Sequence, residues 1–295
     1  MNVAFIGLGA IGTPMARRVA EAAFPLTVWN RTQSRARDFA AANRARTAST
    51  PADAVRDADV VITCLPNSPE VLALLDGESG LLAGLREGAT LVDCTSGEPP
   101  TSRQIAGRLR QHGIDFIDAP VSGGVSGAEK GALTVMVGGD ASVLERVRPV
   151  LASFGQKIVH CGAIGAGDAL KAVNNALLAV HIWSAAEGLA LLAKEGVSAR
   201  VALDVINASS GRSNASMNLF PERVLTRAFP RTFRLALLDK DVGIAAAVAS
   251  ADAIPAPVLQ LTSALWKVAH NALGEVADHV EAVKLIEQWA GVEIV

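Results

Sequence analysis

Tyrosine is absent from this 295-residue chain, and aromatic residues make up only 4% of it. Charged residues are also few, at 19%, and the formal net charge is −2. A nucleic-acid-binding surface needs a basic stripe or a platform of aromatic side chains, and the sequence offers neither. The small net charge also provides no general attraction to anionic membranes. We therefore expect no nucleic-acid or membrane partner, and any bound anion must be held by local groups.

Cysteine and histidine are equally scarce, and their spacing matches no common metal site. Cys64, Cys94 and Cys161 form no CxxC pair, and the five histidines show no HxxxH or HExxH spacing. Each cysteine ends a hydrophobic run, which favours buried free thiols and a reducing compartment. No basic or hydrophobic leader precedes the first strand-like run. We predict no metal site and a cytoplasmic location.

The first half of the chain alternates β-branched runs with helical periods, which predicts a parallel sheet covered on both faces. The expected strands are Val3–Ile6, Leu26–Trp29, Val60–Cys64, Thr90–Asp93, Phe116–Ile117, Thr134–Val137 and Ile158–His160. The expected helices between them are Ala10–Ala23, Gln33–Asn43, Glu70–Leu75, Thr101–Gln111 and Ala141–Phe154.

Strand alternation stops after His160, and the remainder is predicted to be helical. The expected helices span residues 165–195, 199–208, 215–227, 235–251, 257–273 and 278–289. With 50% hydrophobic residues the chain can bury two cores or an oligomer interface. We therefore expect an α/β dinucleotide-binding domain over residues 1–163 and an all-α domain over residues 164–295, which begins with the long helix 165–195.

A glycine-rich turn directly follows the first predicted strand. Gly7-Leu8-Gly9-Ala10-Ile11-Gly12 is a GxGxxG sequence that opens a helix. Its first glycine makes a tight turn, its second lets a pyrophosphate approach the backbone, and its third lets the helix pack on the strand. The free N–H groups of the helix N-terminus bind phosphate. In this strand–turn–helix context the sequence predicts a dinucleotide site rather than a merely tight turn.

The end of the second strand indicates which dinucleotide is bound. NAD-binding proteins usually place an acidic residue there, but this chain has Asn30-Arg31-Thr32. The Arg31 guanidinium can pair with a 2′-phosphate, and Asn30 or Thr32 can donate hydrogen bonds to it. We therefore predict that NADP is preferred and NAD is the alternative. The competing interpretation is that Arg31 is one of several exposed arginines.

Three further turns follow strands and are expected to line the site. Leu65-Pro66 and Thr95 come at carboxyl ends of strands, where ligands bind on such sheets. Thr95 could instead cap the next helix. Ser122-Gly123-Gly124 offers backbone N–H groups in a concave loop that suits a small carboxylate, although the segment could equally be a flexible connector.

The long predicted helix carries an unusual polar face on an apolar rod. Lys171, Asn174 and Asn175 stand at i, i+3 and i+4 and therefore share one face. Burial of an ammonium and two amides is costly unless a ligand binds them. The rod is long enough to raise a transmembrane interpretation, but its polar face favours a buried helix of a soluble protein.

Four segments in this order resemble the β-hydroxyacid dehydrogenase family: residues 7–16, 118–128, 162–175 (GAIGAGDALKAVNN) and 237–245 (LLDKDVGIA). The likeness covers essentially the whole chain. It implies a Rossmann-type domain, a long interdomain helix and an all-α domain that assembles homodimers or homotetramers. The family's usual methionine before the third glycine is Ile11 here.

The resemblance assigns roles residue by residue. Lys171 matches the catalytic lysine, and Asn174 and Asn175 match substrate-contacting amides. Ser122, Gly123 and Gly124 match the loop that holds the substrate carboxylate. The matched cofactor contacts are Leu65, Pro66, Thr95 and Lys240, and Phe233 is weakly matched to a residue that closes over the substrate.

These roles imply hydride transfer between a nicotinamide and a small hydroxyacid or semialdehyde. Lys171 would shuttle the proton, with a pKa lowered by desolvation, although an exposed helix lysine is the bland alternative. Rival interpretations are an NAD-dependent 3-hydroxyisobutyrate-type dehydrogenase and a non-catalytic nicotinamide-binding scaffold. Imine reductases usually lack this lysine. The sequence names neither the substrate nor the physiological direction, and Arg212 could recognise a second anion or cap a helix.

Overall fold

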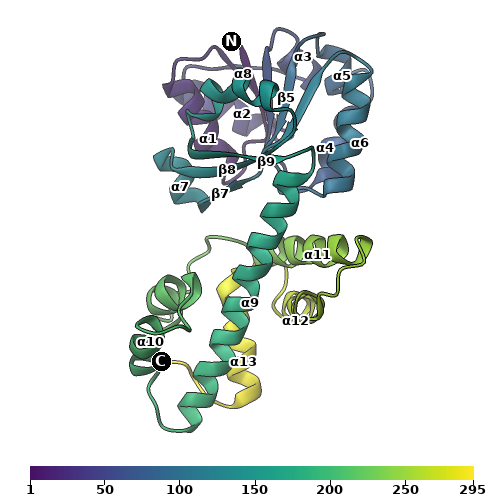
Figure 1. Ribbon diagram of the computed structural model, residues 1–295. Coiled ribbons are helices and arrows are strands. Elements are labelled where there is room, and N and C mark those ends of the chain that lie inside the picture. The colour runs from purple at the N-terminus through teal and green to yellow at the C-terminus, as the bar shows by residue number, and fades with distance from the viewer. The chain divides into compact units, whose positions relative to one another are not determined.

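The computed structural model describes all residues 1–295, which form two compact units, Met1–Lys171 and Ala172–Val295. The first unit is α/β and the second is helical, as expected (Figure 1). The division falls inside helix α9 (Ala166–Lys194), which begins in the first unit and ends in the second. Lys171 is thus the last residue of the first unit.

The first unit is built on a nine-stranded sheet in the order β3-β2-β1-β4-β5-β6-β8-β7, with β9 paired to β8. The strands are β1 (Val3–Ile6), β2 (Leu26–Trp29), β3 (Arg46–Thr47), β4 (Val60–Thr63), β5 (Thr90–Asp93), β6 (Asp115–Asp118), β7 (Val121–Ser122), β8 (Leu133–Gly138) and β9 (Gly155–Gly162). All seven predicted strands are present. The two-residue strands β3 and β7 were not predicted, because two residues carry no periodic pattern.

The prediction of a wholly parallel sheet holds only for part of it. Strands β1 to β6 are parallel, but β8 runs antiparallel to β6 and β7 and parallel to β9. The connection from β7 to β8 contains only one short helix, and a crossover to a parallel strand needs a dozen or more residues. The chain therefore returns antiparallel at this point. The order reverses between β1 and β4, and ligands bind at such a switch point.

Helices cover both faces of the sheet, because alternate residues of each strand face opposite cores. On β1, Val3 and Phe5 face one core, whereas Ala4 and Ile6 face the other. Helices α1 (Gly12–Glu21), α2 (Gln33–Ala42), α7 (Gly124–Lys130) and α8 (Ala141–Leu151) cover the first face. Helices α3 (Pro51–Val55), α4 (Ser68–Ala73), α5 (Leu81–Gly84) and α6 (Pro99–Arg110) cover the second (Figure 1). The short helices α3, α5 and α7 were not predicted from the sequence.

The second unit packs its helices around the later turns of α9. They are α10 (Ala199–Asn207), the π-helix η1 (Ala215–Val224), α11 (Leu235–Ala251), α12 (Pro257–Leu273), the 3₁₀ turn η2 (His279–Ala282) and α13 (Val283–Ala290). As predicted, no strand follows β9. The core centres on the fully buried Trp266, which meets Trp183 edge-to-face with ring centroids 6.2 Å apart.

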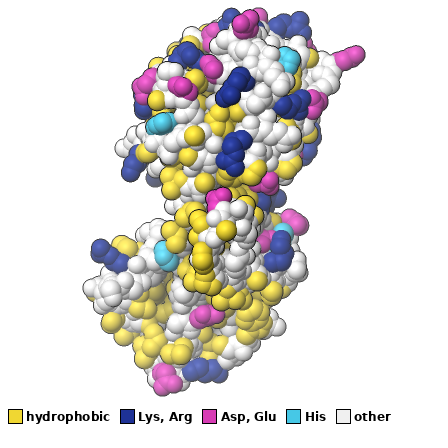
Figure 2. All heavy atoms as spheres, turned by 45° about the vertical axis from the view of Figure 1, so that its right-hand side comes forward, with side chains coloured by type: hydrophobic (Ala, Val, Ile, Leu, Met, Phe, Trp, Pro, Cys, Tyr) yellow, Lys and Arg dark blue, Asp and Glu magenta, His cyan; other side chains and the backbone are white.

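Helix α9 passes the length and hydropathy test for a membrane span, as the sequence indicated. A core helix of a soluble protein passes the same test. Its buried face contributes Ala172, Ala176, Ala179, Ile182 and Trp183 to the helical core. Hydrophobic side chains also reach the surface of the helical unit (Figure 2). The exposed hydrophobic residues on α12 include Val258, Leu261 and Val268.

Candidate functional site

The glycine turn has the geometry that a dinucleotide requires. Gly7 has a φ of +106°, and a Cβ there would lie 2.4 Å from the carbonyl oxygen of Cys64. A Cβ on Gly12 would lie 2.1 Å from the carbonyl oxygen of Gly7. A Cβ on Gly9 would instead meet open space, which is where a pyrophosphate needs to approach the backbone. No side chain caps the N-terminus of α1, so its N–H groups fit a phosphate.

Asn30 and Arg31, which follow β2, differ in their contacts and in their exposure. Asn30 accepts a hydrogen bond from the backbone N–H of Leu8 at 2.9 Å, and its amide donates to the carbonyl of Thr32 at 3.1 Å. The Asn30 side chain therefore holds the glycine turn against the end of β2. Arg31 projects outward with 84% of its side chain exposed, and its guanidinium lies 3.9 Å from Glu70. Among these residues Arg31 is the group suited to meet a 2′-phosphate.

The turns after β4 and β5 are tied to each other and to the glycine turn. Thr95 is buried and its hydroxyl accepts a hydrogen bond from the backbone N–H of Leu65 at 3.1 Å. A Cβ on Gly7 would lie 2.8 Å from the Leu65 side chain, so the glycine turn and the turn after β4 are in close contact. The alternative role of Thr95 as a helix cap is wrong, since α6 begins at Pro99 after Glu98 without a side-chain cap.

Asp93 sits directly beneath the Thr95 turn. Its carboxylate accepts hydrogen bonds from the Thr63 hydroxyl at 2.8 Å and from the Thr95 backbone N–H at 3.0 Å. Burial raises the pKa of Asp93 to about 6, and the hydrogen bonds from the two threonines only partly offset this. The ends of β4 and β5 therefore depend on one buried carboxyl group.

The predicted carboxylate-binding segment is not one open loop. Ser122 lies in strand β7, where it pairs with Thr134 of β8. Gly123 and Gly124 have φ angles of +134° and +64° and lead into α7. The flexible-connector alternative is therefore wrong for this segment. Gly123 and Gly124 are exposed, and their backbone is open to a ligand at the start of α7.

Lys171 lies in the second turn of α9 and is only 9% exposed. The bland alternative of an exposed helix lysine is therefore wrong. The first turn of α9 is anchored by two buried carboxylates, Asp118 and Asp168. Neither was predicted from the sequence to be a site residue. Asp118 is the last residue of β6 and the first residue of the segment 118–128, and Asp168 is a charged residue in the first turn of the apolar helix α9. Their partners are far away in the sequence.

In the helical unit, the predicted polar residues form a chain of contacts. The Asn175 amide donates to Asp241 at 2.6 Å, and the Lys240 ammonium lies 3.0 Å from the same Asp241 carboxylate. Asn175 is buried, whereas Asn174 is exposed and donates to Asn175 at 3.2 Å. Asp241 is thus a residue that sequence reasoning missed, although its neighbour Lys240 was selected.

Phe233 lies in the segment before α11 and is held by the start of η2. Asp278 accepts hydrogen bonds from the backbone N–H groups of Thr232 at 2.7 Å and Phe233 at 2.9 Å. Burial favours the neutral form of Asp278, but His279 and these N–H groups outweigh it and lower its pKa. Arg212 is exposed, and the turn before η1 is closed by Ser213 and Ser216 instead.

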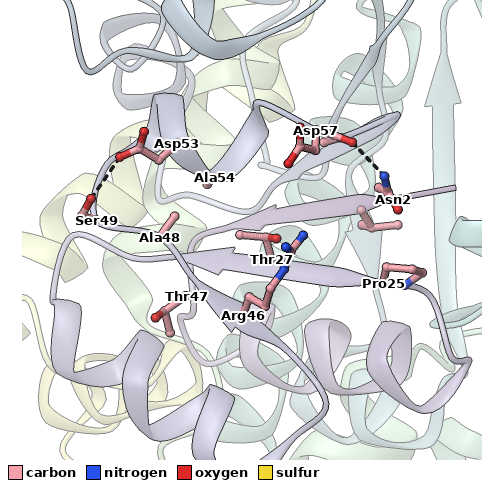
Figure 3. A pocket seen from close by; sticks show the side chains of 12 residues that line it. Asn2, Pro25, Thr27, Arg46, Thr47, Ala48, Ser49, Asp53, Ala54 and Asp57 are labelled. Atoms are coloured by element: carbon pink, nitrogen blue, oxygen red, sulfur yellow. Dashed lines mark hydrogen bonds between the residues drawn. The ribbon is translucent and has the colours of Figure 1, made fainter.

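A separate cavity of about 290 Å³ lies along the edge of the sheet near β3 (Figure 3). Arg46, Asp53 and Asp57 provide its charged groups, and Asn2 donates to the Asp57 carbonyl there. No predicted site residue lines it. The cavity includes the amino ends of β1 and β2, whereas the glycine turn follows the carboxyl end of β1.

The sheet order, the glycine turn and the open space at Gly9 together define a Rossmann-type dinucleotide-binding unit. Residues 2–162 match the family model described as the NAD binding domain of 6-phosphogluconate dehydrogenase. Residues 165–286 match the model described as the NAD-binding domain of NADP-dependent 3-hydroxyisobutyrate dehydrogenase.

Similar proteins agree with both matches. A Pseudomonas aeruginosa NAD-dependent L-serine dehydrogenase is 38% identical over 273 residues, which are 90% of this chain and 91% of that protein. A 2-(hydroxymethyl)glutarate dehydrogenase from Eubacterium barkeri is 35% identical over 100% of this chain and 97% of its own. The Mycobacterium tuberculosis 3-hydroxyisobutyrate dehydrogenase structure with L-serine has a TM-score of 0.89 at 32% identity, covering 97% of this chain and 98% of that one. The chain belongs to the β-hydroxyacid dehydrogenase family, and it is an enzyme.

Proposed function

We propose that this enzyme interconverts a small β-hydroxyacid and its semialdehyde with NADP(H), and that Lys171 is its general acid–base. The observation that carries the proposal is the burial of the Lys171 side chain, 9% exposed, on a helix whose start is anchored beside the turn after β5. An ammonium is costly to take out of water, and its burial at this position favours a specific role for Lys171. The named relatives act on small hydroxyacids or their derivatives, which supports the substrate class.

The residues of the first unit provide the cofactor half of the site. When bound, the nicotinamide cofactor would donate or accept the hydride. The N–H groups at the start of α1 would hold its pyrophosphate, and Leu65, Pro66 and Thr95 would line its path across the strand ends. Arg31 supports the preference for NADP, because its exposed guanidinium can form charge-assisted bonds to a 2′-phosphate.

The remaining residues would bind and protonate the substrate. Backbone N–H groups at Gly123 and Gly124, with the Ser122 hydroxyl, would hold the carboxylate. Lys171 would give a proton to the substrate oxygen in reduction and take it back in oxidation. Asn175, one helical turn from Lys171, would orient the same oxygen, with its own amide oriented by Asp241. In the family assignment Lys240 would reach the cofactor.

An NAD-dependent dehydrogenase of the 3-hydroxyisobutyrate or serine type is the second candidate. It is favoured by the NAD-dependent L-serine dehydrogenase that is 38% identical to this chain. Because L-serine is itself a β-hydroxyacid, the same Lys171 chemistry applies to it. The two candidates differ in the dinucleotide and in the group at the far end of the pocket.

Self-association is also part of the proposal. Val258, Leu261 and Val268 lie on one side of α12 and are 60%, 62% and 47% exposed. Apolar stripes of this kind mark protein interfaces. This stripe supports a homodimer or homotetramer.

The test is a spectrophotometric screen of wild type and Lys171→Ala with NADPH and NADH. The aldehydes are the glyoxylate, succinic, tartronate, methylmalonate and sulfolactaldehyde types, and L-serine and 3-hydroxyisobutyrate are assayed in the oxidative direction with NADP⁺ and NAD⁺. We expect NADPH to be preferred and Lys171→Ala to lower kcat by roughly 10²–10⁴-fold, with NADPH binding retained. A variant that turns over at the wild-type rate would show that Lys171 is not the acid–base.

A further inference from the structure

Two buried carboxylates meet at the start of α9. Asp118, at the end of β6, accepts hydrogen bonds from the backbone N–H groups of Gly165 at 2.7 Å and Asp168 at 3.0 Å. Asp168 itself accepts hydrogen bonds from the Gly97 backbone N–H at 3.2 Å and from the Ser102 hydroxyl at 2.6 Å. The first turn of α9 is thereby bonded to β6, to α6 and to the turn after β5.

The backbone is shaped to allow this contact. A Cβ on Gly97 would lie 3.1 Å from one Asp168 oxygen and 2.5 Å from the Ser68 hydroxyl. A Cβ on Gly167 would lie 2.3 Å from the carbonyl oxygen of Met136 and 2.8 Å from Asp118. Side chains at Gly97 and Gly167 would therefore separate α9 from the sheet. The close packing of α9 on the sheet therefore explains why a small residue, Gly167, stands in the first turn of α9.

The two carboxylates differ in what stabilises their charge. Burial raises the pKa of Asp118, and the N–H groups at the N-terminus of α9, which favour an anion, offset this only in part. Asp168 has one N–H and one hydroxyl, and burial together with the charges of Asp118 and Asp93 raises its pKa well above the usual range. Charged groups near this turn include Lys171 on α9, Glu98, which follows Gly97, and Arg103, whose guanidinium lies next to Gly165.

We propose that Asp168 is a positioning residue, which uses its bonds to Gly97 and Ser102 to fix the Lys171 ammonium relative to the cofactor turn after β5. The inference rests on the proposed role of Lys171. Asp168 precedes Lys171 by three residues, so the two lie on the same side of α9, one turn apart. The bonded turn at residues 95–97 contains Thr95, a proposed cofactor contact.

Small displacements at this point affect turnover strongly. A misplacement of about 1 Å can lower a rate by about 10²-fold, because the reacting groups must be held at the correct distance. Removal of the Asp168 carboxyl frees the first turn of α9 from both α6 and the turn after β5. Bonds from Asp118 remain and keep the helix N-terminus formed. The expected result is a helix that folds but holds Lys171 less well.

The experiment compares Asp168→Ala, Asp168→Asn and Ser102→Ala in the full-length enzyme, with kcat and the dissociation constant of NADPH measured for each. We expect Asp168→Ala to lower kcat by about tenfold or more and Ser102→Ala by severalfold, while NADPH binding changes by less than about threefold. Asp168→Asn should recover most of kcat, since its amide can accept from Gly97 and donate to Ser102. Asp140→Ala is the matched control, because Asp140 also accepts one backbone N–H and one hydroxyl bond, both from Ser142, at the start of α8.

The outcomes separate this inference from the proposed function. Wild-type kcat in Ser102→Ala and in soluble Asp168→Ala would overturn the positioning role, even if Lys171→Ala is inactive. An equal loss of kcat and of NADPH binding would show a merely structural role and would also overturn it, as would an Asp168→Asn variant as slow as Asp168→Ala. If Asp168→Ala does not fold, the kcat values of Ser102→Ala and Asp168→Asn decide whether Asp168 positions Lys171. Full activity of Lys171→Ala would instead remove the proposed function itself.

Discussion

Arg31 and Asn30 are neighbours with opposite tasks at the end of β2. The Asn30 side chain forms hydrogen bonds within the protein, because it accepts from the Leu8 N–H and donates to the Thr32 carbonyl. Arg31 is exposed, and its guanidinium lies 3.9 Å from the Glu70 carboxylate. A contact of this length between exposed groups is weak. The guanidinium is therefore available to a phosphate at little cost.

Replacement of Arg31 by Ala tests the cofactor preference at the scale of one residue. We expect the KM for NADPH to rise about tenfold or more, because a charge-assisted bond to the 2′-phosphate is lost, and the KM for NADH to stay nearly constant. Arg37→Ala, an exposed arginine on α2, is the control and should change neither value. Steady-state kinetics with both dinucleotides measure the effect. Equal changes for NADPH and NADH in Arg31→Ala would remove the structural basis for an NADP preference.

At the scale of secondary-structure elements, the ends of β4 and β5 share one buried carboxyl group. Asp93 is 1% exposed and links Thr63 of β4 to Thr95 in the turn after β5. In the unfolded chain an aspartate titrates near 3.8, whereas burial raises the pKa of Asp93 in the folded protein to about 6. The folded protein thus keeps a proton that the unfolded chain releases. This proton stabilises the fold fully below about pH 3.8, and the stabilisation is lost as the pH rises through about 6.

Asp93→Asn should remove this pH dependence while it keeps the acceptor for Thr63 and Thr95. A pKa difference of this size corresponds to about 3 kcal/mol. We therefore expect the variant to match wild type near pH 4 and to exceed it in stability near pH 8. Thermal unfolding between pH 4 and 8 measures the slope. Asp140→Asn, at an exposed carboxylate with a lowered pKa, serves as control. An unchanged slope in Asp93→Asn would contradict the assignment.

At the scale of the whole molecule, the end of the chain is fastened within the helical unit by one glutamate. Glu287 of α13 accepts hydrogen bonds from the Arg227 guanidinium and from the backbone N–H of Ile294 at 2.8 Å. Arg227 adopts a φ of +55°, which is unfavourable for a residue with a side chain. Ile294 is fully buried. One carboxylate thus joins the segment after η1 to the C-terminal residues.

Glu287→Ala should lower the free energy of unfolding of the helical unit by about 2–4 kcal/mol. It leaves the Ile294 N–H without its acceptor and Arg227 with Glu293, at 3.3 Å, as its remaining carboxylate partner. Arg227 is partly exposed, so the loss stays below that of a fully buried pair. Tryptophan fluorescence during denaturation reports on this unit, which holds Trp183, Trp266 and Trp289. Glu145→Ala breaks the exposed pair with Arg148 and should leave the free energy of unfolding nearly unchanged, because exposed ion pairs contribute little. Equal losses in the two variants would refute the fastening role.

Local patterns in the sequence predicted the elements that local physics controls. The glycine turn, the seven longer strands and α9 follow from hydrophobic periodicity and from glycine spacing, which act within a few residues. Lys171, Asn175 and Lys240 could be selected because the motifs that carry them are contiguous. The two-residue strands β3 and β7 lack enough length for a pattern.

The tertiary structure alone decided which distant groups meet. Asp118 bonds to Asp168, Asp168 bonds to Ser102, and Asn175 bonds to Asp241, although each pair is separated by 50 or more residues. A carboxylate in a sequence has no mark that names its partner, since hydrogen bonding depends on where the fold brings the two groups. The antiparallel course of β8 has another origin, because the connection from β7 to β8 is too short for a crossover to a parallel strand. The sequence thus determined the elements and the side chains that they carry, and long-range packing determined how the start of α9 is held against the sheet.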